Sequence, residues 1–165
     1  KSLISTKLVL YIRIMLKLNK MTDYALVCLG VLSQKSKIFM SAQDISNESG
    51  LPLTTVQKIL KKLIATSDII MGIRGANGGY KIKKSVDKIS IVNVIEALDG
   101  PIKITSCVEG AKETCKSRSL CLLEGNWNKI NKLIVQTLNN FSVEDLIYGE
   151  NVFITSKKNK IKKNY

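Results

Sequence analysis

Residues 41–64 read SAQDISNESGLPLTTVQKILKKLI, and this stretch decides the fold. Ser41, followed three residues later by Asp44, is typical of a capping box at a helix start and predicts a short helix over 42–49. Pro52 predicts the start of a second helix, because a proline in the first turn loses no backbone hydrogen bond. Two short helices joined by such a tight turn predict a helix-turn-helix.

The second helix is predicted to have an apolar face and a polar face. Its apolar residues recur at helical spacing and predict a buried stripe of Val56, Ile59, Leu60 and Leu63. Its polar residues are Thr54, Thr55, Gln57, Lys58, Lys61 and Lys62. In a helix-turn-helix the second helix lies in the major groove of DNA, and its N-terminal side chains reach base edges. Gln57 suits adenine, and Lys58 suits guanine or phosphate. The last two lysines lie further along the helix and suit phosphates. The alternative is an ordinary solvated helix face.

A hairpin is predicted directly after this helix. Residues 69–73 read as a strand, residues 74–79 as a tight loop and residues 80–84 as the return strand. A hairpin in this place is a wing, and Arg74 can approach a narrow minor groove because small residues surround it. Asn77 is the second candidate DNA contact in the loop. The loop does not resemble a nucleotide-phosphate loop, because no helix pattern follows it.

Composition and charge divide the chain into two halves. It has 165 residues, 45% of them hydrophobic, which suffices for one packed domain. The formal net charge is +13. Residues 15–84, the predicted DNA-binding domain, hold eleven basic and four acidic residues, whereas residues 85–155 hold seven basic and nine acidic ones. This asymmetry indicates a polyanion partner for the first half. Residues 85–148 are predicted to form a sensor loop and a dimerisation helix.

One further helix is predicted before the helix-turn-helix and another after the wing. Residues 18–34 place Ala25, Cys28, Leu29 and Leu32 on one apolar face, which predicts a buried thiol at Cys28. Residues 90–99 predict a helix that is capped by Ser90 and ended by a Gly-Pro pair.

The other three cysteines lie close together in a polar segment. Cys107, Cys115 and Cys121 are separated by seven and five residues, and no close CxxC pair of the zinc type is present. Three thiolates among Lys112, Lys116 and Arg118 suit an iron–sulfur cluster. The chain has no histidine, so the candidates for a fourth ligand are Glu124, Asp23 or a small molecule. A three-thiol zinc site and a thiol redox switch remain open alternatives.

A long helix is predicted after the cysteines. Its apolar residues recur at steps of three or four: Leu123, Trp127, Ile130, Ile134, Leu138 and Phe141. This seam extends over about three heptads. A seam with no other element left to cover it predicts a homodimer, because symmetric dimers are the commonest oligomers. Residues 142–145 predict a capped last short turn.

The two ends are expected to lie outside the fold. Residues 1–14 are expected to be a non-native or misread extension, with the native start at Met15. The apolar run over 3–16 is shorter than the ~20 residues of a membrane helix and lacks a signal cleavage site. We therefore expect a cytoplasmic protein with no membrane partner. The basic tail over 149–165 is expected to be disordered.

These motifs, taken together, resemble the Rrf2 family of bacterial winged-helix repressors. The resemblance rests on TDYAL at 22–26, IRGANGGY at 73–80, IVNVIEALDGP at 91–101, the three cysteines and GNWNKIN at 125–131. It covers about residues 15–148 and is closest to the regulators of the SUF iron–sulfur assembly operon. It implies a mostly α fold: a winged helix-turn-helix, a long C-terminal dimerisation helix and a cysteine-bearing cluster loop.

The resemblance also implies a function. It predicts a homodimeric repressor of iron–sulfur assembly genes that binds a double-stranded DNA operator, with one cluster per subunit on Cys107, Cys115 and Cys121. Assembly proteins would supply the cluster. In the cluster-assembly regulators a histidine lies three residues after the last cysteine, where this chain has Glu124. In the nitric-oxide sensors an aspartate that Asp23 matches ligates a four-iron cluster. The two-iron cluster is the first interpretation and the four-iron cluster the alternative.

The operator preference cannot be transferred from the family, because Gln57 stands where the cluster-assembly regulators carry a glutamate. The rival interpretations are a metal-free thiol-switch or partner-responsive repressor, and DNA binding stabilised by zinc. An enzyme finds little support, because the chain has no histidine base, paired carboxylates or nucleophile elbow.

Overall fold

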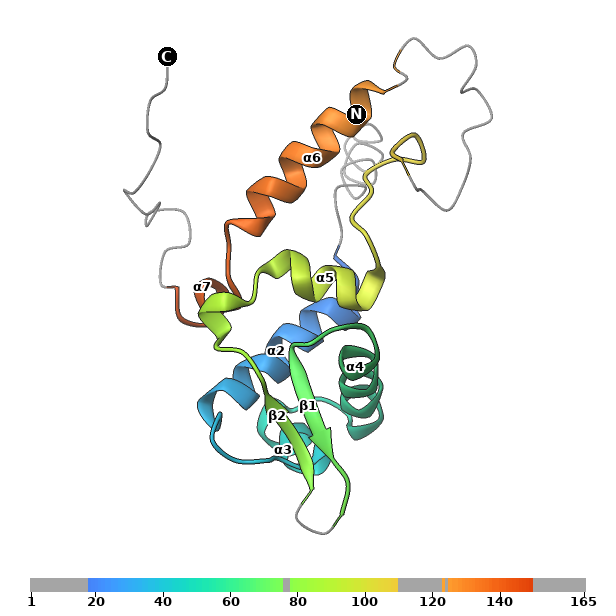
Figure 1. Ribbon diagram of the computed structural model, residues 1–165. Helices are drawn as coiled ribbons and strands as arrows, with labels where there is room; N and C mark the ends of the chain where they lie inside the picture. The colour runs from blue at the N-terminus through green and yellow to red at the C-terminus, as the bar shows by residue number, and fades with distance from the viewer. Residues whose placement is uncertain (1–17, 76–77, 110–122, 124, 150–165) are drawn as a thin grey trace, which may run out of the picture.

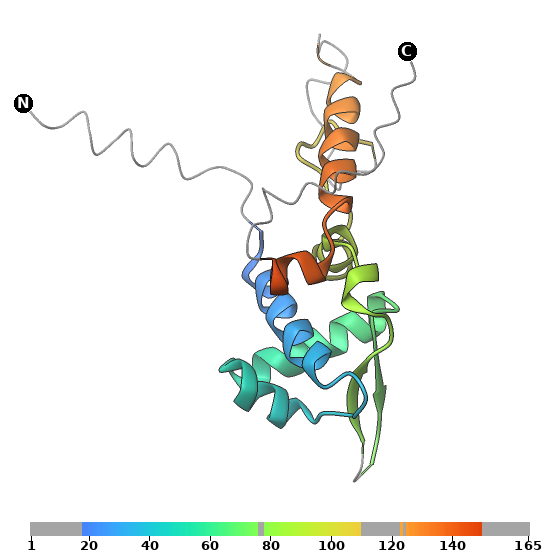
Figure 2. The same cartoon turned by 90° about the vertical axis from the view of Figure 1, so that its left-hand side faces the viewer.

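The structure is a computed structural model that describes residues 18–75, 78–109, 123 and 125–149 (Figure 1). The expected extension over 1–14 lies outside these residues, as does nearly all of the tail over 149–165. Within the described part, helices α2 to α5 and a small hairpin form a compact body from which α6 projects (Figure 1). Figure 2 shows α6 and the hairpin at opposite ends of the molecule.

The predicted helix-turn-helix is confirmed. Helix α3 spans Ala42–Ser49 and α4 spans Leu53–Thr66. The Ser41 hydroxyl accepts from the backbone N–H of Asp44 at 3.1 Å, and the Ser41 backbone N–H donates to the Asp44 carboxylate at 3.1 Å. This reciprocal pair satisfies two backbone donors that a helix start leaves unpaired, which explains why α3 begins where it does.

The core lies where α2, α4 and α5 meet. Helix α2 spans Lys20–Gln34 and α5 spans Ile91–Asp99. Their predicted apolar faces are buried, and the fully enclosed side chains include Ala25, Cys28, Leu29, Val56, Ile59, Leu60, Leu63 and Val94. Burying such a side chain contributes about 1.5–3 kcal/mol. The apolar stripe of α4 therefore faces the core, and its polar face is left to the solvent.

The wing is an antiparallel hairpin of β1 (Ile70–Ile73) and β2 (Gly79–Ile82). The return strand begins one residue earlier and ends two residues earlier than the predicted range of 80–84. After the strand, Lys83 and Lys84 form ion pairs with Asp68, and a short 3-10 turn over Val86–Lys88 follows.

The loop end of the wing, where β2 begins opposite the last residue of β1, is tied to the connection between α2 and α3. Met40 and Tyr80 exchange two backbone hydrogen bonds, of 3.0 and 2.7 Å. Gly79 lies against this bridge with a φ of +152°, and a Cβ there would meet the Met40 carbonyl oxygen at 2.5 Å. A glycine is therefore required for the hairpin to approach the Met40 backbone this closely.

The predicted long helix is shorter than expected. Helix α6 spans Asn126–Asn139 and α7 spans Val143–Tyr148, so Leu123 and Phe141 lie outside α6. Gly125 has a φ of +78° and starts the helix late, and Ser142 caps α7 through Asp145. The seam that remains on α6 is only partly covered: Ile130 is 44% exposed, and Trp127, Ile134 and Leu138 are half-buried.

None of the helices in the described part of the chain combines the length and apolar character that a membrane span requires. The expectation that no membrane partner is bound stays a prediction.

Replacing Leu60 by alanine should destabilise the fold by about 2–5 kcal/mol, because the fully buried side chain leaves a cavity. Ile64→Ala on the same helix is the matched control: Ile64 is 43% exposed, and we expect a loss of about 1 kcal/mol. Urea unfolding followed by circular dichroism measures both. Equal losses for the two variants would show that the apolar stripe is not the core face of α4.

Candidate DNA interface and cysteine site

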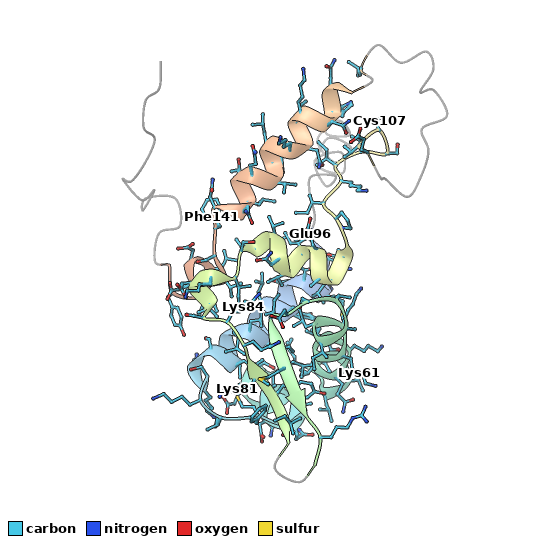
Figure 3. All side chains as sticks on the ribbon, viewed as in Figure 1. Lys61, Lys81, Lys84, Glu96, Cys107 and Phe141 are labelled. Carbon is cyan, nitrogen blue, oxygen red and sulfur yellow. The ribbon has the colours of Figure 1, made fainter. Side chains whose placement is uncertain are left out.

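The polar face of α4 is open to solvent along its length. Thr54, Gln57, Lys58, Lys61 and Lys62 are exposed, and Thr55 is half-buried. Lys61 projects away from the body of the molecule in Figure 3. The first turn of α4 contains no acidic residue, and Pro52 provides no side-chain cap. Helix starts of this kind attract phosphate, because their backbone N–H groups and dipole favour negative charge.

The cations of α4 and those of the wing differ in what they contact. Within the described residues, Lys58, Lys61 and Lys62 form no ion pair. Lys83 and Lys84 pair with Asp68. Among the described residues, the three lysines of α4 therefore remain available to a polyanion, as does the exposed Arg74 after β1.

Contacts with the α2–α3 connection also hold the middle of the return strand β2. The Lys81 ammonium donates to the Lys37 carbonyl oxygen at 3.2 Å and lies 5.8 Å from the centre of the Phe39 ring. This lysine therefore supports the wing from within. Its sequence neighbours gave no indication of this contact, because both partners come from the α2–α3 connection.

Arg74 and Asn77 are the two DNA contacts that were predicted at the tip of the wing. Arg74 is exposed just after β1, as the expected role requires. Asn77 lies outside the described residues.

Cys107 lies in the segment that follows α5, beside the upper part of α6 (Figure 3). Its side chain is half-buried, and its backbone N–H donates to the Thr105 hydroxyl at 3.3 Å. The other expected ligands Cys115, Cys121 and Glu124 lie outside the described residues. Asp23 is exposed in the first turn of α2.

The fourth thiol is in a different environment. Cys28 is fully buried, and this burial raises its pKa to about 11. A thiol with that pKa stays protonated near neutral pH, whereas metal ligation requires the thiolate. The prediction that Cys28 is a core residue is confirmed.

The donor set tests whether the cysteine segment suits an iron–sulfur cluster. Cys107 is a partly exposed sulfur in a non-helical segment, which is the chemistry that soft iron–sulfur ligation uses. Within the described residues, no three potential ligands of the His, Cys, Asp or Glu type come together. The Cys107 sulfur fits the group, and the other two expected sulfur ligands, Cys115 and Cys121, lie outside the described residues.

Sequence reasoning missed two asparagines of α6. Asn131 is 8% exposed, and its amide donates to the Ile102 carbonyl at 2.9 Å and accepts from the Ile104 N–H at 3.0 Å. Asn128 accepts from the Glu109 N–H at 3.0 Å. The three-residue spacing that places both on one helix face was visible in NWNKIN, but asparagines on a helix read equally well as solvent-facing residues.

A helix-turn-helix with an attached hairpin and a solvent-facing second helix defines the class of winged-helix DNA-binding proteins. Within that class, residues 18–149 match the model of the Rrf2 family, described as an iron-dependent transcriptional regulator. The chain therefore belongs to the Rrf2 family. It is a DNA-binding transcriptional regulator and not an enzyme.

Related proteins agree with this assignment. The HTH-type transcriptional regulator IscR of Erwinia tasmaniensis is 27% identical over 115 residues, which are 70% of this chain and 68% of that protein. IscR of Vibrio vulnificus is 28% identical over 149 residues, which are 88% of this chain and 86% of that protein. The solved structure of CymR (YrzC), the global cysteine regulator of B. subtilis, superposes with a TM-score of 0.59 at 26% sequence identity. The match covers 81% of this chain and 97% of the CymR chain.

Cys28→Ala should leave any bound iron unchanged, because the buried neutral thiol is not a ligand. The variant should lose about 1–2 kcal/mol of unfolding free energy through the small cavity it creates. Iron content per protein and thermal unfolding, measured against the wild type, check both expectations. A loss of iron from a stably folded Cys28→Ala protein would contradict the separation of the two sites.

Proposed function

We propose that this chain is a homodimeric repressor that binds operator DNA through α4 and the β1–β2 hairpin and responds to an iron–sulfur cluster on Cys107, Cys115 and Cys121. Its expected targets are iron–sulfur assembly genes. The observation that carries the proposal is the arrangement of the two sites: the basic face of α4 and the half-buried Cys107 beside α6 are connected through α5, which packs against both helices.

The exposed residues of α4 support readout in the major groove. Thr54, Gln57 and Lys58 lie in the first turns of the helix, where side chains of a recognition helix reach base edges. Lys61 and Lys62 lie a turn further on, where they suit phosphates. Arg74 extends the contact toward the adjacent groove from the wing, and Asn77 is proposed for the same role.

The exposed apolar residues of α6, in the seam and beside it, support a dimer with a second copy of this chain. Leu133 is 63% exposed and Ile130 is 44% exposed, in a helix that stands away from the body (Figure 2). Two copies of α6 would cover each other's apolar residues, and closed twofold symmetry would then present two α4 helices to one duplex. Two half-sites are bound together when they lie about 34 Å apart, which is one turn of DNA.

The cysteine segment supports sensing. When bound, an iron–sulfur cluster supplies metal–sulfur bonds that depend on iron supply and redox conditions. The residues that would hold it are Cys107, Cys115 and Cys121, with Glu124 or Asp23 as the fourth ligand. A two-iron cluster is the first proposal and a four-iron cluster, as in a nitric-oxide sensor, is the second. A change in the fold of this segment would alter the tilt of α6 and thereby the spacing of the two α4 helices.

A metal-free thiol switch is the second candidate function. The observation that favours it is the half-buried Cys107 thiol in a non-helical segment, in a fold that is also similar to CymR, the global cysteine regulator of B. subtilis. Elemental analysis of protein purified without oxygen separates the candidates. Iron with acid-labile sulfide supports the cluster, zinc supports a structural metal site, and neither supports the thiol switch.

Gln57→Ala should weaken binding to an operator selected from random DNA by about 1–3 kcal/mol and relax the preference at one base pair. Lys62→Ala should weaken binding to all sequences alike. It should also reduce the slope of the logarithm of affinity against the logarithm of salt concentration by about one, because one phosphate contact is lost. Lys129→Ala, an exposed lysine on α6, is the matched control and should change neither. Fluorescence anisotropy over a salt series measures all three. If Lys129→Ala had the largest effect, α4 would not be the recognition helix.

Cys107→Ala should remove the visible absorbance of protein purified without oxygen, and operator binding should no longer change with iron or oxygen. Cys28→Ala is the control that keeps the other three thiols. The measurements are absorbance, iron and sulfide content, and operator affinity before and after exposure to air. A Cys107→Ala protein that keeps both its cluster and its switching would refute the ligand assignment.

A further inference from the structure

A buried asparagine sits in the middle of α6. In this helix, which the structure describes in full, Asn131 is the one buried residue. A buried amide is costly unless its donor and acceptor are both satisfied. Here the backbone of the segment that follows α5 satisfies both: the Ile102 carbonyl accepts at 2.9 Å and the Ile104 N–H donates at 3.0 Å.

A second contact lies one turn earlier on the same helix. Asn128 accepts from the Glu109 N–H at 3.0 Å. Segment 102–109 is therefore fixed to α6 at two points, and Cys107 lies between them. The segment is also folded on itself there, because the Val108 N–H donates to the Thr105 carbonyl at 3.3 Å and Val108 is 8% exposed.

The other end of α6 is fixed to the start of α5. The Ile91 N–H donates to the Phe141 carbonyl at 2.9 Å, and the Val143 N–H donates to the Ile89 carbonyl at 2.8 Å. These bonds flank an antiparallel bridge between Ser90 and Ser142. Helix α6 thus meets α5 at a hydrogen-bonded joint, and α5 continues into the segment that returns to α6.

The three parts form a triangle. Helix α5 is one side, α6 is the second and segment 102–109 is the third, as the path of the chain in Figures 1 and 3 shows. Because the three parts are joined to one another, α6 can tilt relative to α5 only if the asparagine contacts with segment 102–109 or the hydrogen bonds at the α5–α6 joint break. Helix α5 is in turn held to α4, because the Thr66 hydroxyl donates to the Ala97 carbonyl at 2.7 Å.

We propose that Asn131, with Asn128, is a positioning residue that fixes the angle between the dimer helix α6 and the DNA-reading helix α4. The inference rests on the proposed function, because it assumes a dimer through α6. It adds the physical connection: segment 102–109, which carries Cys107, is the strut that holds the angle, and the two asparagine amides join that strut to α6.

The connection can be tested in cluster-free protein. In Asn131→Ala the Ile104 N–H loses its acceptor, so its hydrogen exchange should be about fivefold to tenfold faster than in the wild type. Asn139→Ala, an exposed asparagine in the last turn of α6, is the matched control and should leave that exchange unchanged. If Asn131→Ala does not fold, Asn128→Ala tests the same strut through the exchange of the Glu109 N–H.

A second measurement separates positioning from local stability. The probes are duplexes that carry the selected operator with no, one or two base pairs inserted between the half-sites, and each base pair moves the half-sites apart by about 3.4 Å. The wild type and Asn139→Ala should bind the inserted duplexes much more weakly than the operator. Asn131→Ala should lose a measurable part of that penalty, because its α6 is then held only by the Asn128 contact and by the joint with α5.

The outcomes distinguish the inference from the function on which it rests. Faster exchange together with a reduced spacing penalty supports the strut. Unchanged Ile104 exchange, or faster exchange with the full wild-type penalty, overturns it. A wild-type protein that binds a single half-site as a monomer contradicts the proposed dimer itself. A wild-type protein that takes up no cluster contradicts only the proposed sensing, since both measurements use cluster-free protein.

Discussion

The burial of α5 is the constraint on which the rest of the molecule depends. Ile91, Val92, Val94, Ile95, Ala97 and Leu98 are all buried in a helix of nine residues, so the helix is enclosed by other elements on most of its circumference. It packs against α2, α4 and α6, and its two ends are held by hydrogen bonds. At its C-terminal end, Asp99 accepts from the Thr22 hydroxyl at 2.7 Å. An apolar helix enclosed in this way cannot shift for one neighbour without disturbing the others, and so α5 relates the DNA-reading half to the half that carries Cys107.

The sequence was sufficient for those parts of the fold that depend on local chemistry. The capping pair at Ser41 and Asp44, the apolar stripe of α4 and the hairpin that follows it can each be predicted from residues close together in the chain. The limits of α6 were harder to place. Its hydrophobic repeat continues through Leu123 and Phe141, whereas the helix itself is limited by the left-handed Gly125 and by the Ser142 cap. Periodicity reports which residues could share a face, and backbone conformation decides where the face ends.

The contacts that organise the candidate sites could not be read in this way, because they join residues far apart in the chain. Asn131 contacts a segment 27 and 29 residues earlier. Nothing in the amide itself distinguishes that role from exposure to solvent. The same holds for charge. A count of lysines in the first half overstates the charge that a duplex would meet, because Asp68 pairs with two lysines just after β2, whereas the α4 lysines form no ion pair within the described residues. Tertiary pairing, which composition does not record, determines which charges are available.

The close approach of Gly79 to the Met40 backbone has a consequence for how proteins of this architecture can diverge. The two strands are held in place at the loop end of the hairpin, since no side chain fits between Gly79 and the Met40 backbone. Changes in length are therefore confined to the loop between the strands, away from the hydrophobic core. The reach of the hairpin can then be lengthened or shortened while its angle of approach is kept, and such changes would tune affinity for a promoter with little effect on how well the domain folds.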